Sequence, residues 1–159
     1  MARSTFVYVI YIRTTPEKLW SALTRDTEFM KQYWFGVHCE SQWTAGSSWK
    51  MVHPDGGISD VGEIVAVDPP RRLVIRWQHK LKPELKAEGE SLCTMELEPI
   101  GSVVRLSITH AIERQPSKFI EAVSGGWPKI LSNLKSLLET GSAVLGDPYP
   151  LRSSQRGKD

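Results

Sequence analysis

The sequence has little of what marks several large classes of protein. It contains two cysteines, Cys39 and Cys93, and no CxxC pair, so their spacing indicates neither a zinc nor a redox site. Twenty Lys and Arg against eighteen Asp and Glu leave a formal charge of +2, too small to indicate a nucleic-acid partner. No apolar run approaches the roughly 20 residues that span a bilayer, and no signal-like segment opens the chain. We therefore expect a cytoplasmic protein without membrane insertion.

Sequence motifs of hydrolases and nucleotide-binding enzymes are missing as well. The chain has no GxSxG, no GxxxxGK and no HExxH. His79, Cys93 and His110 are the one set that a sheet could bring together as zinc ligands, but they lack the local spacing of metal ligands. We expect no metal and no cofactor.

The chain does have a pattern of strands and helices that fits one domain over residues 1–145, and the polar, proline-containing residues 146–159 are expected to form a disordered tail. β-branched and aromatic residues predict a strand at 5–12, inside the sheet or under a helix. Capping residues predict short helices at about 16–24 and 26–35. Strands separated by turn signals follow from 39 to 112 and predict an antiparallel meander, in which the inner face of strand 58–67 is ambiguous.

Four strands of this meander alternate clearly between apolar and polar residues, which predicts one buried face. The inward set comprises Trp49, Met51, His53, Leu73, Ile75, Trp77, His79, Cys93, Met95, Leu97, Val104, Leu106, Ile108 and His110. The cover is an amphipathic helix from Phe119 to Leu138. Gly125, Gly126 and Pro128 predict a kink or a fresh start near residue 125, and Gly141 predicts its end.

Three phrases of the sequence resemble one known family. They are Thr15–Thr24, the stretch from Gly62–Ile64 through Asp68–Trp77, and Gly126–Trp127 followed by Leu131, Leu134 and Leu138. In this order they resemble the START and Bet v 1-like superfamily, in the branch similar to the C-terminal domain of activators of the heat-shock protein 90 ATPase. The resemblance covers about residues 5–141 and implies an α+β helix-grip fold, a curved antiparallel sheet wrapped around the last helix.

The resemblance also implies a cavity between that helix and the sheet, which the superfamily uses for lipids, polyketides, hormones and other apolar molecules. The co-chaperones of this branch carry an additional N-terminal domain, which we do not expect here because the first strand begins near residue 5.

Candidate site residues follow from the inward positions. We expect a ligand to be lined by Trp34, Trp49, Met51, Trp77, His79, His110, Val123 and Trp127. Plain core packing is the alternative for the tryptophans, and a closed interior with Trp77 against Trp127 would exclude a binding site. Trp20 is expected to anchor the first helix.

The titratable residues offer candidates for acid–base chemistry. His53, His79 and His110 end inward alternations and are expected at one rim of the sheet, with His110 the first and His79 the second candidate for a general acid or base. Asp60 and Glu63 must point to opposite faces, so they form no carboxylate pair. An inward carboxylate among apolar residues is a further candidate acid or base, because burial raises its pKa, but a solvated edge position is the favoured expectation. The basic residues at 71–86 predict a solvated face.

Three hypotheses for function remain. The first is a binding module for a small apolar, aromatic or lipid-like molecule, and the second is an enzyme of cyclase, dehydratase or hydrolase type. The third is a regulator of a chaperone ATPase that acts through protein contact, and either a monomer or a homodimer fits all three.

Overall fold

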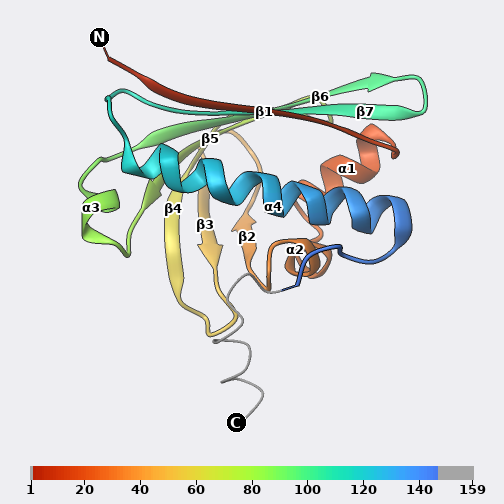
Figure 1. Cartoon of the computed structure of the whole chain (residues 1–159), viewed down its shortest axis with the longest axis horizontal. Coiled ribbons are helices and arrows are strands. Elements are labelled where there is room, and N and C mark those ends of the chain that lie inside the picture. The colour runs from red at the N-terminus through yellow and green to blue at the C-terminus, as the bar shows by residue number, and fades with distance from the viewer. Residues whose placement is uncertain (1, 147–159) are drawn as a thin grey trace.

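The fold is a curved antiparallel sheet wrapped around one long helix (Figure 1), as the helix-grip prediction requires. The computed structural model describes residues 2–146, so the predicted tail lies outside the described residues except for Gly146. The seven strands are β1 (Ser4–Ile12), β2 (His38–Ser41), β3 (Ser48–Val52), β4 (Ile58–Asp68), β5 (Arg72–His79), β6 (Ser91–Ile100) and β7 (Val103–Ile112). The helices are α1 (Pro16–Leu23), α2 (Thr27–Tyr33), α3 (Pro83–Lys86) and α4 (Lys118–Thr140).

The strand order is β1-β7-β6-β5-β4-β3-β2, and every neighbouring pair is antiparallel. The meander from β2 to β7 is therefore confirmed. The short helices are confirmed too, with Thr15 and Asp26 accepting hydrogen bonds from the first turns of α1 and α2. The short helix α3, between β5 and β6, was not predicted. Over residues 2–146, no helix combines the length and apolar character needed to cross a membrane.

The first strand corrects one expectation. β1 packs under α4 as one alternative predicted, but it lies at the edge of the sheet rather than inside it. Phe6, Tyr8 and Ile10 pack against the core, while Val7 and Tyr11 on the other face are exposed. A β-branched and aromatic composition favours a strand whether one face is buried or two, so it could not distinguish these places.

A bulge in β4 explains its ambiguous pattern. The register with β5 shifts between Ile64 and Ala66, so the residues before and after that point follow different alternations. Ile64 is fully buried, and Val67 packs partly against the core after the shift. Asp60 shares the inward phase of Ile64, whereas Glu63 points outward and pairs with Arg76 at 2.7 Å.

The long helix α4 is continuous through Pro128, so the predicted fresh start near residue 125 is wrong. Trp127, Leu131 and Leu134 all bury against the sheet, and this packing spans the point where proline removes a backbone hydrogen bond. Glu88, from the loop after α3, fixes the start of the helix by accepting hydrogen bonds from the Ser117 hydroxyl and the backbone N–H of Lys118. Gly141 ends the helix in the left-handed conformation with φ 89°, as predicted.

Candidate functional site

A cavity of about 230 Å³ lies between α4 and the concave face of the sheet. Aromatic and aliphatic side chains dominate its wall. The lining residues are Trp34, Met51, Asp60, Trp77, His79, Lys82, Leu85, Phe119, Ala122, Val123, Gly126, Trp127 and Ile130. A second hollow of about 380 Å³ continues along α4 and shares with it Trp34, Met51, Ala122, Gly126 and Ile130. The two hollows therefore adjoin along one face of the helix.

Six of the eight residues expected to line a ligand surround this cavity. They are Trp34, Met51, Trp77, His79, Val123 and Trp127. Trp49 and His110 differ from that expectation, since both lie behind Trp77, with ring centroids 4.5 and 4.9 Å from its ring. All three side chains are buried, but of the three only Trp77 lines the cavity, a difference of depth that alternation along a strand does not encode.

The contact between Trp77 and Trp127 bears on the alternative of plain core packing. The two rings meet edge to face at 6.0 Å, so sheet and helix touch at this point. The interior is nevertheless not closed around them, because the 230 Å³ cavity is bounded by both rings. The ring of Trp34 also packs against Trp127, with 5.5 Å between ring centroids, and extends the aromatic wall to α2.

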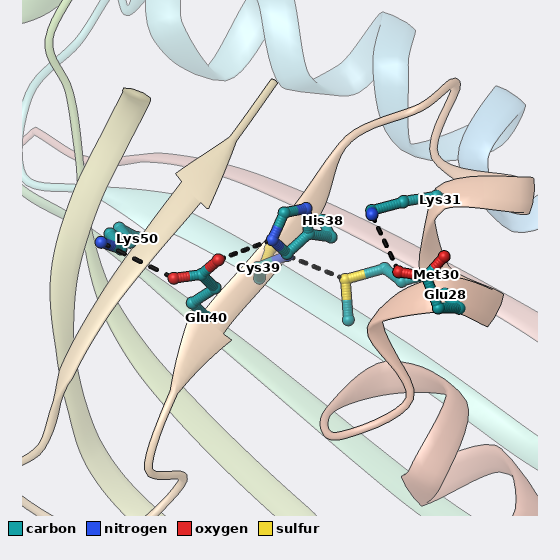
Figure 2. A network of polar contacts seen from close by, with 7 residues as sticks. All are labelled: Glu28, Met30, Lys31, His38, Cys39, Glu40 and Lys50. Atoms are coloured by element: carbon teal, nitrogen blue, oxygen red, sulfur yellow. Dashed lines mark hydrogen bonds and ion pairs between the residues drawn. The ribbon is translucent and has the colours of Figure 1, made fainter. Parts of the chain in front are cut away.

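The position of Trp34 depends on how α2 is attached to the sheet. Trp34 follows the last turn of α2, and its backbone N–H donates a hydrogen bond to the backbone carbonyl of Met30. The fully buried Met30 thioether in turn accepts a hydrogen bond from the backbone N–H of Cys39 on β2, with 3.1 Å between nitrogen and sulfur (Figure 2). This contact gives the outer edge of β2 a partner and holds α2 beside it.

The other contacts in Figure 2 lie away from the cavity. Glu40 accepts a hydrogen bond from His38 at 2.7 Å and forms an ion pair with Lys50 at 3.6 Å. The pair with Lys50 connects β2 to β3. Hydrogen bonding from His38 is the main cause that lowers the pKa of Glu40. None of these three residues lines either hollow, so they support the scaffold rather than the site.

Asp60 is the inward carboxylate that the sequence left open as an alternative. Its side chain is 8% exposed and lines the cavity, so the expectation of a solvated edge position is wrong. Its Oδ2 accepts hydrogen bonds from the indole N–H of Trp77 at 2.7 Å and from Nδ1 of His79 at 3.2 Å. The bulge in β4 hid this residue, because it made the alternation of the strand look inconsistent.

His110 is held as a neutral ring. The Trp127 indole N–H donates to its Nδ1 at 3.2 Å, which requires the ring proton to be on Nε2. Ser91 also indicates that the ring proton is on Nε2. The Ser91 hydroxyl donates its hydrogen to the backbone carbonyl of Trp77, so it must accept the hydrogen bond from Nε2 of His110. Burial lowers the pKa of His110 to about 3. Both nitrogens are occupied, so the residue has no free atom for proton transfer to a ligand.

The three histidines do not share one rim. His53 bonds to Ser59 at 2.8 Å and lines the second hollow, and His79 lines the first. His110 is fully buried, because Phe119 of α4 closes over it edge to face at 5.2 Å. Burial under the covering helix, which strand alternation does not place, thus distinguishes His110 from the other two.

Metal binding finds no support between residues 2 and 146, where no three His, Cys, Asp or Glu side chains lie close enough to hold an ion. Cys93 is completely buried, and burial raises the pKa of its thiol, which opposes the thiolate form that zinc requires. His79, Cys93 and His110, the one set that the sequence left open, are therefore not a ligand set in this structure.

Gly125 and Gly126 border the cavity on α4. Gly126 lines both hollows and Gly125 the second. A Cβ atom built on either residue would meet nothing within 4 Å, so neither glycine is needed for close packing. Two consecutive residues of the helix therefore leave open space beside the aromatic wall.

The fold and this cavity define a helix-grip protein of the Bet v 1-like class. The family model described as activator of Hsp90 ATPase homolog 1-like protein matches residues 13–139, and the chain belongs to this family. No curated protein matches the chain.

Solved structures with the same fold come from several organisms. Protein MLL2253 of Mesorhizobium loti is similar over 86% of this chain and 97% of its own, with 24% identity and a TM-score of 0.73. The Aha1 dimer of Colwellia psychrerythraea is similar over 87% and 98%, with 23% identity and a TM-score of 0.67. An Hsp90 activator of Plasmodium falciparum is similar over 84% and 95%, with 21% identity and a TM-score of 0.68. At these identities the likeness shows the fold.

Proposed function

We propose that this chain binds a small apolar, aromatic or lipid-like molecule between α4 and the sheet. The observation that carries the proposal is the open cavity walled by Trp34, Trp77 and Trp127. Small-molecule sites are concave, mostly apolar spaces of about 300–1,000 Å³ with a few polar groups. The second hollow, of about 380 Å³, falls in this range, and the cavity of about 230 Å³ is smaller but adjoins it.

The glycines of α4 support the same proposal. Glycine in a helix interior costs about 1 kcal/mol relative to alanine, and alanine would fit at Gly125 and Gly126 without a clash. Packing therefore does not explain the pair. A need for open space at the entrance of a binding site explains the two glycines, since any larger side chain at Gly126 would extend toward both hollows.

Titration with N-phenyl-1-naphthylamine, an apolar dye whose fluorescence rises in apolar surroundings, tests the proposal. Wild-type protein should bind the dye, and Val123→Trp should weaken binding about 10-fold or more because the indole fills the cavity. Glu121→Trp is the matched control, since it adds the same side chain at an exposed position of α4 outside both hollows. Equal dye binding by both variants, or none by wild type, would contradict the proposal.

Regulation of a chaperone ATPase is the second candidate, and the family itself favours it. The structures from Colwellia psychrerythraea and Plasmodium falciparum are named as Aha1 and as an Hsp90 activator. Added to purified Hsp90, the chain should then raise the rate of ATP hydrolysis and be recovered with the chaperone in a pull-down. If neither effect is seen with the chain in excess, this candidate is removed, and the cavity proposal is unaffected.

Acid–base catalysis on the same scaffold is the third candidate. The site favours His79 over His110 for this role, because His79 lines the cavity and both nitrogens of His110 are occupied. For any substrate found, His110→Ala should leave the chemical step unchanged in protein that remains folded, whereas His79→Ala should slow it.

A further inference from the structure

Asp60 differs from every other residue around the cavity in carrying a nearly buried negative charge. Its side chain is 8% exposed, and that remaining surface lies in the wall of the cavity. A carboxylate taken out of water is costly unless hydrogen bonds replace its hydration. The partners of Asp60 therefore indicate what a ligand must supply.

The hydrogen bonds to Asp60 are unevenly divided between its two oxygens. Oδ2 accepts from the indole N–H of Trp77 and from Nδ1 of His79. No described residue donates to Oδ1. Since a carboxylate offers about four acceptor sites, Asp60 retains capacity for another donor on the side of the cavity.

The other charged and polar groups at the site select the kind of donor. Lys82 lines the cavity from the α3 side, and its exposed position lets water solvate its charge. His79 already donates to Asp60, and its Nε2 is buried without a partner among the described residues. The remaining wall is apolar, with the rings of Trp34, Trp77 and Trp127 presenting flat surfaces.

We infer that the ligand is an apolar ring system bearing a hydroxyl or amino group, and that this group donates a hydrogen bond to Asp60. The inference rests on the proposed function and names the chemistry of its ligand. The indole rings bind the flat apolar body, and the carboxylate orients it by its single donor. A ligand that presents its own carboxylate to the same place is rejected by like charge.

Two probes of nearly the same shape test the inference. 2-Naphthol can donate to Asp60, whereas 2-methoxynaphthalene has the same rings and no donor. Calorimetric titration of wild-type protein should show 2-naphthol binding about 10-fold more tightly, as expected for a hydrogen bond to a buried charged acceptor. Asp60→Asn should reduce this preference, because the amide can present N–H to the cavity in place of the second carboxylate oxygen. Glu63→Gln is the matched control, being the same kind of change on the outward face of β4.

The outcomes separate the inference from the proposed function. Equal affinity for the two probes in wild type overturns the inference and leaves the apolar binding site in place. Binding of neither probe overturns both. If Asp60→Asn fails to fold, the carboxyl ¹³C resonance of Asp60 in wild-type protein replaces the variant. 2-Naphthol should shift it, 2-methoxynaphthalene should not, and a shift with neither probe overturns the inference.

Discussion

Trp127 on α4 donates its indole N–H to Nδ1 of His110 on β7 across 3.2 Å, and this bond joins the long helix to the strand beside the β1 edge of the sheet. It continues through Ser91 to the carbonyl of Trp77, so one chain of hydrogen bonds crosses β7, β6 and β5 behind the cavity. Every donor in that chain has an acceptor, which makes His110 a structural residue that fixes the aromatic wall.

His110→Ala should destabilise the protein by about 3–5 kcal/mol. The change removes a buried ring and leaves the Trp127 N–H and the Ser91 hydroxyl without their partner. Urea denaturation followed by tryptophan fluorescence measures the free energy of unfolding. A loss below about 1 kcal/mol would show that the chain of hydrogen bonds does not hold the helix to the sheet.

The low pKa of His110 predicts a loss of stability in acid. Burial lowers the pKa to about 3 from 6.5, so below pH 6.5 the unfolded chain takes up a proton that the folded protein does not. The contribution of His110 to the free energy of unfolding is complete above pH 6.5 and is lost as the pH falls toward 3. Urea midpoints between pH 7 and 4 should therefore fall less steeply in His110→Asn than in wild type. Parallel profiles for His110→Asn and wild type would contradict the assignment.

Substitutions at Gly126 of α4 should separate stability from binding. Gly126→Ala should stabilise the protein by about 0.5–1 kcal/mol, because alanine favours the helix and its Cβ meets open space. Gly126→Leu should instead weaken dye binding by occupying the hollows. Gly141→Ala is the control on the same helix and should destabilise, since φ is 89° there. A destabilised Gly126→Ala would mean that packing, rather than open space, requires glycine.

The two thiols should be protected in the folded protein. Burial is the largest cause that raises the pKa of both Cys39 and Cys93, so little thiolate is present at pH 8. Reaction with 5,5′-dithiobis(2-nitrobenzoic acid) should be at least about 100-fold slower in native protein than in urea. Rapid native labelling of either cysteine would show that its part of the core opens readily.

Much of the architecture could be predicted because its signals are local. Alternation placed Trp77 and Ile108 inward, capping residues gave the starts of α1 and α2, and Gly141 gave the end of α4. Edge and interior strands were not distinguished, because the composition of β1 suits both.

The site was predicted in outline but not in depth. Inward positions found six lining residues, whereas Trp49 and His110 pack against Trp77 without reaching the cavity, which depends on tertiary packing. Asp60 was left as an open alternative rather than assigned to the site, because the bulge between Ile64 and Ala66 makes the inner face of β4 ambiguous. The orientation of its side chain becomes evident only from its bonds to Trp77 and His79.

The indole N–H resonances of the six tryptophans test the central claim most directly, once each is assigned by single Trp→Phe variants. On titration with 2-naphthol, we predict that the ¹H–¹⁵N signals of Trp34, Trp77 and Trp127 shift together, while that of Trp20 on α1 stays in place. If the three cavity resonances do not move at saturating probe, or if all six move equally, the space between α4 and the sheet is not a specific binding site.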